Sequence, residues 1–439
     1  MRAPTYLFLP IDAGRRHRGE PGRSDPSPAR SPRWARRCRG GVRPLVAVLA
    51  ALLAAVSLGA CGDDDPGSAG GTDARGCITD FRQDTDYFPV KSTFSHARNV
   101  TISYHQSYQV LTVKQPYPDG RPESYVLVHC GAPAPTLTGA LGSAPRIEVP
   151  IRSLYSGSTT HLPLLVDLDR TDTLTGVASA ASVVNADIRR LITEGRVTEY
   201  AAGGKINVEK VVTGRPDVLM TDGTDSPDYA AIRRGGVPVV ANAEWLEGDP
   251  LGRAEWIKVM AALTGDEEKA GKVFDRIAGD YTAIAAKVSG AGQQPVAVLP
   301  GSMYQGTWYM PSGGSYVGKL LADAGAGYPW SGTRDTGSLE LAFEAVYAKA
   351  GSAPIWLADG EWKTIGDATK EDSRYGTLAA TRAGGQVWTN TLVIGPGGGN
   401  DYWERGVTGP DLVLGDLVAI LHPDLAKDHR FAFYRRLTS

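Results

Sequence analysis

Residues 266–288 read DEEKAGKVFDRIAGDYTAIAAKV, and their apolar side chains recur every three or four positions. The apolar positions are Ala270, Val273, Phe274, Ile277, Tyr281, Ile284 and Val288. This spacing places them on one face of a helix. The pattern therefore predicts a helix over 266–288, which would be about 35 Å long at a rise of about 1.5 Å per residue.

Short apolar strands alternate with helices on both sides of this long helix. Before it, the sequence predicts strands at Thr173–Ala178, Asp217–Met220 and Val237–Ala241, and helices at Val183–Ile192 and Val208–Thr213. After it, the sequence predicts strands at Pro295–Leu299, Pro354–Leu357 and Gln386–Trp388, and helices at Ser315–Ala324, Leu341–Ala350 and Asp411–Leu421. Such alternation is typical of parallel sheets that helices cover on both faces. We expect an α/β protein with two Rossmann-like lobes joined by one long helix.

The N-terminal sequence resembles the signal of a bacterial lipoprotein. An apolar run, Leu45–Ala60, follows several arginines and ends at Cys61. Cys61 would carry a lipid and become the first residue of the mature chain. A transmembrane helix is the alternative, although the run is slightly short for spanning a bilayer.

These observations divide the chain into five parts. We expect a signal peptide and upstream extension at 1–60 and a lipid-anchored flexible linker at 61–76, which is too polar and Gly-rich to fold. An N-terminal α/β lobe would follow at 77–262, then the connecting helix at 263–290 and a C-terminal α/β lobe at 291–439. The expected location is the extracytoplasmic face of the cell membrane.

The start of the N-terminal lobe is predicted to be a β-rich extension. Val100, Ile102 and Tyr104 alternate with polar residues, and Tyr125–His129 reads as a second strand. Cys77 and Cys130 lie on either side of this segment. An even pair in an exported protein predicts a disulfide, with two buried free thiols as the alternative.

Charge and histidine content argue against two classes of partner. Of the 46 basic and 48 acidic residues, 11 and 3 lie in 1–60, so the remainder has a net charge of −10. No basic stripe is present, so we expect no nucleic-acid partner. The histidines show no metal-ligand spacing, so we predict no bound metal and no cofactor.

Several motifs together resemble the substrate-binding proteins of ABC importers for iron–siderophores, haem and vitamin B12, known as class III periplasmic binding proteins. The motifs are Asp172-Thr-Leu-Thr-Gly-Val177, Asn207-Val-Glu-Lys-Val-Val212 with Arg215-Pro-Asp-Val-Leu219, Gly236-Val-Pro-Val-Val240, Pro250-Leu-Gly-Arg-Ala-Glu-Trp256 and Gly306-Thr-Trp-Tyr309. The likeness spans about 145–436.

The resemblance implies a binding protein rather than an enzyme. It would be a monomer that holds an iron–siderophore or a similar metal chelate between its lobes and delivers it to an ABC permease and its ATPase. The resemblance also implies that one exposed glutamate on each lobe, Glu209 and Glu344, docks on the permease. The alternative for both residues is a favourable charge in the first turn of a helix.

Candidate ligand-binding residues follow the predicted strands, because ligands of open α/β sheets lie beyond the carboxyl ends of strands. A large, partly flat chelate needs aromatic faces and a few polar groups. The candidates are Thr159, Thr160, His161, Trp245, Arg253, Tyr304, Trp308, Tyr309, Trp362 and Arg405. The alternative is a core role for Trp308 and Tyr309 and structural ion pairs for Arg253 and Arg405.

Three other functions remain open at this point. A lipid-anchored zinc or manganese receptor would share the two-lobe fold, but the histidines disfavour it. An extracellular hydrolase is disfavoured because the chain has no Gly-x-Ser-x-Gly nucleophile elbow. A sensor or adhesion module could use the same lobes without transport.

Overall fold

The computed structural model describes residues 71–439. The predicted signal, Cys61 and the linker up to residue 70 lie outside the described residues. Among residues 71–439, no helix combines the length and apolar character that a membrane crossing requires.

The N-terminal extension forms a four-stranded sheet in the order β1-β2-β3-β4. Its strands are β1 (Val100–Tyr104), β2 (Tyr108–Val113), β3 (Glu123–His129) and β4 (Arg146–Val149). The first three strands are antiparallel, and β4 pairs with β3 in parallel. The disulfide predicted between Cys77 and Cys130 is confirmed. It fixes the start of the extension to the end of β3.

The N-terminal lobe is built on an all-parallel sheet in the order β7-β6-β5-β8-β9. Its strands are β5 (Leu154–Ser156), β6 (Leu174–Val177), β7 (Thr198–Glu199), β8 (Val218–Thr221) and β9 (Val239–Ala241). Its helices are α1 (Leu162–Asp167), α2 (Ala186–Thr193), α3 (Val208–Gly214), α4 (Pro227–Arg234), α5 (Pro250–Glu255) and α6 (Ile257–Thr264).

The C-terminal lobe repeats this plan with a sheet in the order β13-β10-β15-β16-β17. The central strands are β10 (Val296–Pro300), β15 (Ile355–Ala358) and β16 (Gln386–Thr389), which run parallel, with β13 (Ala326–Gly327) and β17 (Arg435–Arg436) at the edges. A second small sheet contains β11 (Ser302–Tyr304), β12 (Thr307–Pro311) and β14 (Ser338–Ala342). The helices are α8 (Tyr316–Asp323), α9 (Phe343–Ala350), α10 (Ile365–Glu371), α11 (Asp401–Glu404) and α12 (Pro410–Leu421).

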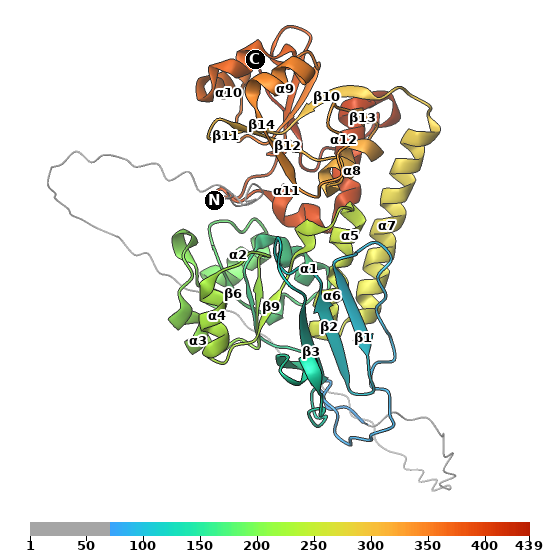
Figure 1. Cartoon of the computed structure of the whole chain (residues 1–439), viewed down its shortest axis with the longest axis vertical. Helices are drawn as coiled ribbons and strands as arrows, with labels where there is room; N and C mark the ends of the chain where they lie inside the picture. The colour runs from blue at the N-terminus through green and yellow to red at the C-terminus, as the bar shows by residue number, and fades with distance from the viewer. Residues whose placement is uncertain (1–70) are drawn as a thin grey trace, which may run out of the picture. The chain divides into compact units, whose positions relative to one another are not determined.

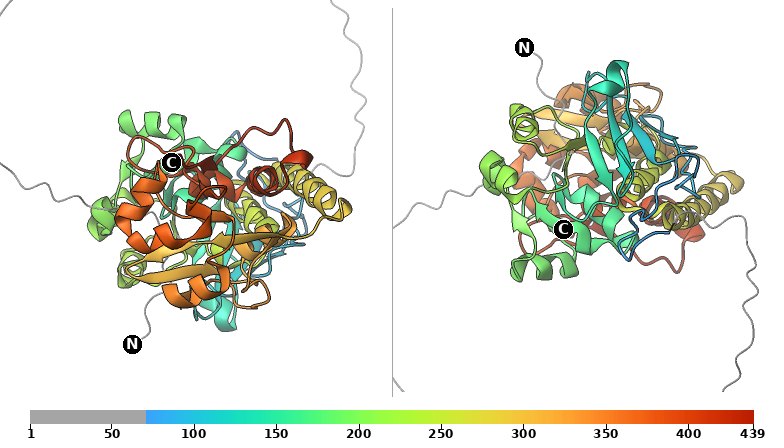
Figure 2. Two further views of the ribbon diagram at one scale, coloured as in Figure 1. Left: turned by 90° about the horizontal axis from the view of Figure 1, so that it is seen from above. Right: turned by 90° about the horizontal axis from the view of Figure 1, so that it is seen from below.

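The long helix predicted over 266–288 is α7, Glu267–Gly290. Its buried residues, among them Phe274, Ile277 and Tyr281, are the apolar positions of the sequence pattern. Helix α7 runs along the side of both lobes, beside the extension at one end and the C-terminal lobe at the other (Figures 1 and 2). Gln109 of β2 donates to Glu267 at 2.9 Å, and the Tyr281 hydroxyl donates to Asp323 of α8 at 2.6 Å.

Two predicted helices begin later than expected. The helix expected over Val183–Ile192 begins at Ala186, after the N-cap residue Asn185. The helix expected over Leu341–Ala350 begins only at Phe343, because Ser338–Ala342 forms strand β14 and pairs with β12. Pairing with a neighbouring strand outweighs the local helical pattern here.

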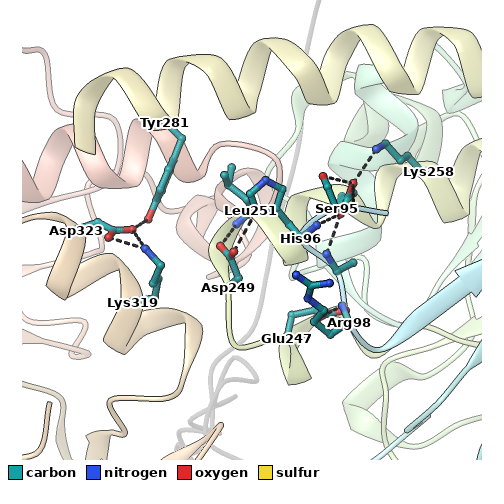
Figure 3. Close-up of polar contacts among 12 residues, drawn as sticks. Ser95, His96, Arg98, Glu247, Asp249, Leu251, Lys258, Tyr281, Lys319 and Asp323 are labelled. Carbon is teal, nitrogen blue, oxygen red and sulfur yellow. Dashed lines mark hydrogen bonds and ion pairs between the residues drawn. The ribbon is translucent and has the colours of Figure 1, made fainter. Parts of the chain in front are cut away.

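The extension is attached to the lobes through buried carboxylates near α5 (Figure 3). Glu255 accepts hydrogen bonds from the backbone N–H groups of Ser95, His96 and Ala97 and from the ammonium group of Lys258 at 2.7–3.1 Å. Glu247 accepts the N–H groups of Arg98 and Asn99 at 2.8 and 3.0 Å. A carboxylate that receives several N–H donors satisfies groups that would otherwise be buried without partners. The extension is therefore an integral part of the fold.

Candidate functional site

The parallel strands of each lobe end at the loops that approach the other lobe. In the N-terminal lobe, β5 leads to the short helix η2 (Thr159–His161), and β9 leads to η5 (Glu244–Leu246). In the C-terminal lobe, β15 leads to Asp359 and β16 leads to Asn390. Helix η2 packs against α11 of the C-terminal lobe. The carboxyl ends of the two parallel sheets therefore meet at one interface between the lobes.

His161 is fully buried at the end of β5. The Ser156 hydroxyl donates to the Ser158 carbonyl at 2.7 Å, and Ser156 Oγ lies 3.0 Å from His161 Nδ1. This geometry makes Nδ1 the protonated nitrogen, and Nε2 has no hydrogen-bond partner among the described residues. Burial lowers the pKa of His161 to about 3, so the imidazole is neutral at physiological pH.

Arg253 of α5 joins the two lobes. Its guanidinium donates to Glu244 at 3.1 Å within the N-terminal lobe, and it lies 4.1 Å from the ring centroid of Tyr316 in the C-terminal lobe. Both ionic side chains are almost fully buried. A small cavity of about 10 Å³ adjoins this pair and is lined by Arg253, Tyr316 and Tyr402 among others. The contact is a charge pair that also stacks on an aromatic face.

A glycine-rich strap, defined as residues 391–400, runs from β16 to α11 and lies against the N-terminal lobe. A Cβ atom added to Gly397 or Gly399 would lie 2.3 or 1.9 Å from the carbonyl oxygens of Ala181 and Ser182. Only glycine permits this close approach of two backbones. Leu392, Val393 and Ile394 are each about two-fifths exposed, so this part of the strap is open to solvent.

Glu404, at the end of α11, makes a second contact between the C-terminal and N-terminal lobes. Its carboxylate accepts the N–H groups of Val184 and Asn185 at 2.7 and 2.8 Å, across the lobe interface. Burial raises the pKa of Glu404 to about 7, although both N–H groups and Arg189 oppose the shift.

Polar residues of the C-terminal lobe meet at the same interface. Asp359 accepts a hydrogen bond from Asn390 at 3.2 Å, and Asn390 in turn accepts one from Asn400 at 3.4 Å. Asp359, Tyr402 and Tyr434 line a cavity of about 20 Å³. Burial raises the pKa of Asp359 to about 6, with the Asn390 hydrogen bond opposing it.

Of the predicted ligand residues, those of η2 and Arg253 lie at this interface. Thr159 and Thr160 are half-buried beside His161, and Trp245 is half-buried with its indole N–H donating to the Asp222 carbonyl at 3.1 Å. Tyr304 and Tyr309 are half-buried on the small sheet. Arg253 lies at the interface as an ion pair.

Three other predicted ligand residues make contacts within the fold. Trp308 is fully buried, donates to the Pro300 carbonyl and packs against Trp356, so the core role weighed for it is the one observed. Trp362 is also buried, and its indole N–H donates to Glu371. Arg405 is exposed, pairs with Asp401 at 2.8 Å and lies over the ring of Phe433. Sequence alone does not separate a tryptophan at a strand end from one in the core.

The sequence prediction missed Tyr316, Tyr402, Tyr434 and Glu404. Tyr402 and Glu404 lie within four residues of the glycine-rich run Gly395-Pro-Gly-Gly-Gly-Asn400. The cluster of glycines was the available signal, because several adjacent glycines often mark a close backbone approach.

Residues 153–387 match the family model described as periplasmic binding protein. The chain belongs to this family. The predicted resemblance to substrate-binding proteins of ABC importers of the haem and siderophore type is confirmed, and so is the two-lobe class III fold. Members of the family are solute-binding proteins rather than enzymes.

Two solved structures and one relative are similar to the chain. A periplasmic haem-binding protein from Pseudomonas aeruginosa has a TM-score of 0.50 at 16% identity, covering 66% of this chain and 99% of that chain. A periplasmic binding protein from Veillonella parvula has a TM-score of 0.50 at 13% identity, covering 74% and 98%. An uncharacterised lipoprotein of Methanocaldococcus jannaschii is 26% identical over 297 residues, which is 66% of this chain and 69% of the relative.

Proposed function

We propose that the chain is an extracytoplasmic solute receptor that binds a metal chelate between its lobes and delivers it to an ABC permease. The observation that carries this proposal is the meeting of the carboxyl ends of two parallel sheets at one interface. This is the usual ligand position in open α/β sheets. The long helix α7 connects the lobes, and it would allow only a small opening motion.

An iron–siderophore, or a haem- or cobalamin-like chelate, is the ligand class that we propose. The aromatic rings of Trp245, Tyr304 and Tyr309 and the hydroxyls of Thr159 and Thr160 supply the mixture that such ligands require. One structural neighbour is named a haem-binding protein. Within residues 71–439, no group of three or more His, Cys, Asp or Glu side chains is placed to hold a bare metal ion.

The ligand class is tested by tryptophan fluorescence of the full chain, purified in detergent. The titrants are ferric hydroxamate, catecholate and carboxylate siderophores, haemin, cobalamin, and zinc and manganese salts. We expect saturable quenching by one type of chelate. A response to the bare metal salts alone would replace the proposal with a zinc or manganese receptor.

Delivery to the permease is proposed to use Glu209 and Glu344. Both lie in the first turn of a helix, α3 and α9, and both are exposed. Glu209 has no ion pair among the described residues, and Glu344 reaches Arg374 at 3.8 Å. Charges at the rim of an interface mainly set the encounter rate and register of docking.

The docking proposal is tested with the double variant Glu209→Arg and Glu344→Arg. We expect uptake of the ligand into cells to be lost while its affinity for the purified receptor stays unchanged. The matched control is Asp275→Arg with Asp280→Arg, which makes the same charge change at exposed positions on α7. Normal uptake by the glutamate double variant would show that docking uses other residues.

Anchoring is proposed to use a lipid on Cys61. The relative from Methanocaldococcus jannaschii is named a lipoprotein. We expect Cys61→Ser to move the protein from the membrane fraction to the soluble fraction. Retention of this variant in the membrane fraction would argue for an uncleaved apolar segment instead.

A further inference from the structure

Asp359 is a carboxylate of the C-terminal lobe that the contacts described so far leave without a charged partner. It follows β15, and its carboxylate lines a small cavity together with Tyr402 and Tyr434. Burial is the main cause of the raised pKa values of Tyr402 and Tyr434, and the negative charge of Asp359 adds to both shifts. The carboxylate therefore lies close to two buried tyrosines at the lobe interface.

No positive charge balances Asp359 among the described residues. Its carboxylate accepts one hydrogen bond, from the neutral amide of Asn390, and it takes part in no ion pair. Burial raises its pKa to about 6, and no charged side chain contributes to that shift. A carboxylate in such surroundings gains free energy when a cation approaches it.

Three arginines near the interface, Arg253, Arg405 and Arg435, have other partners. Arg253 pairs with Glu244, and Arg405 pairs with Asp401. Arg435 donates to Thr391 Oγ1 and to the carbonyl oxygen of Trp362. An anionic chelate would have to compete with these contacts and would also approach the unbalanced charge of Asp359.

The space beside Asp359 has the size of one small polar group. The cavity of about 20 Å³ is lined by Asp359, Gly301, Tyr402 and Tyr434 and by apolar side chains such as Leu320 and Leu417. A single water-sized group needs about 10–15 Å³ of such space. An ammonium group is of this size, brings three hydrogen-bond donors, and is attracted to the face of a tyrosine ring.

We propose that Asp359, together with Tyr402 and Tyr434, binds a protonated amine of the ligand, so that the receptor prefers chelates with an ammonium group over anionic chelates. This inference rests on the proposed function as a chelate receptor. It adds that the ligand bound at this interface carries a positively charged amine.

The test compares two ligands that differ only in the ammonium group. Ferrioxamine B carries a free protonated amine, and its N-acetyl derivative carries a neutral amide in the same place. We expect the full chain, by calorimetric titration at neutral pH, to bind ferrioxamine B at least about tenfold more tightly, the factor that about 1.4 kcal/mol gives. Asp359→Asn should remove most of this preference without changing affinity for the N-acetyl form. Glu361→Gln, which neutralises an exposed carboxylate two residues away, should keep the preference.

The pH dependence gives a second readout. The groups that face Asp359 are Asn390, Tyr316, Tyr402 and Tyr434, and none of these tyrosines ionises below neutral pH because burial raises its pKa. Affinity for ferrioxamine B should fall about tenfold per pH unit below about pH 6, where Asp359 takes up a proton. Affinity for the N-acetyl form should stay constant.

The outcomes separate this inference from the proposed function. Equal affinity for the two forms, or an unchanged preference in Asp359→Asn, would overturn the inference. Binding of ferric enterobactin or haemin without ferrioxamine B would overturn it and leave the receptor function standing. Failure to bind any chelate would remove the proposed function, and the inference with it.

Discussion

At the scale of single residues, buried carboxylates hold segments that are distant in sequence. Glu255 of α5 binds the extension, and Glu404 of α11 binds the segment before α2 across the lobe interface. In both cases a carboxylate accepts backbone N–H groups that have no other described partner. Such contacts are costly to break, because both the charge and the donors lose their partners.

Replacement of Glu255 should destabilise the whole chain. Glu255→Ala leaves three backbone N–H groups without their acceptor and removes the anionic partner of the buried Lys258 ammonium group, which keeps only the Thr93 carbonyl. We expect a loss of roughly 3–5 kcal/mol in the free energy of unfolding, measured by urea titration. The control Glu268→Ala, which removes an exposed pair with Lys272, should have little effect. Equal effects would show that the extension is not held by Glu255.

Glu404 should make the stability of the protein depend on pH. Its pKa is about 7 in the folded chain and near the ordinary glutamate value when unfolded, because burial disfavours its ionised form. The folded chain therefore binds one more proton between about pH 4.5 and 7, so its stability falls as pH rises through that range.

This dependence is measured by comparing urea midpoints at pH 5 and pH 8. From pH 5 to pH 8, the free energy of unfolding of the original chain should fall by on the order of 2–3 kcal/mol more than that of Glu404→Gln. The variant lacks this effect because its side chain cannot ionise. An identical pH dependence in the two proteins would mean that Glu404 does not titrate in this range.

At the scale of elements, the glycine-rich strap makes a close backbone contact between the lobes. Gly399→Ala would place a methyl group 1.9 Å from the Ser182 carbonyl oxygen, so the two segments must separate. We expect a loss of roughly 1–3 kcal/mol in the free energy of unfolding and faster proteolysis within the strap. Gly332→Ala, where a Cβ meets nothing within 4 Å, is the control. Unchanged proteolysis of Gly399→Ala would show that the strap does not depend on this contact.

Elements with a strong local pattern were predictable from the sequence, and contacts between distant segments were not. Helix α7 was predicted within two residues at each end, because its apolar period is continuous. Strand β14 was missed, because its pairing with β12 is tertiary and leaves no local signal. At the site, the sequence could predict that Asp359 follows a strand. It could not predict the contact of Glu404 with Asn185, because 219 residues separate them.

At the scale of the whole molecule, two similar lobes share α7 and one interface, and the extension is fixed to the first lobe. The Cys77–Cys130 disulfide closes a loop with a sequence separation of 53. Removing it with Cys77→Ser and Cys130→Ser should lower the free energy of unfolding by about 3–4 kcal/mol, because the unfolded chain gains entropy. The same loss should follow reduction of the original chain with dithiothreitol. No change after reduction would mean that the two thiols are free in the isolated protein.

The central claim is that the ligand lies between the two lobes. Hydrogen-exchange mass spectrometry of the full chain, with and without the chelate that quenches its fluorescence, tests this claim most directly. We predict slower exchange in both lobes at the strand ends, at residues 157–161, 359–362 and 391–400, and unchanged exchange in β1–β4. Protection confined to one lobe, or to the extension, would contradict the account.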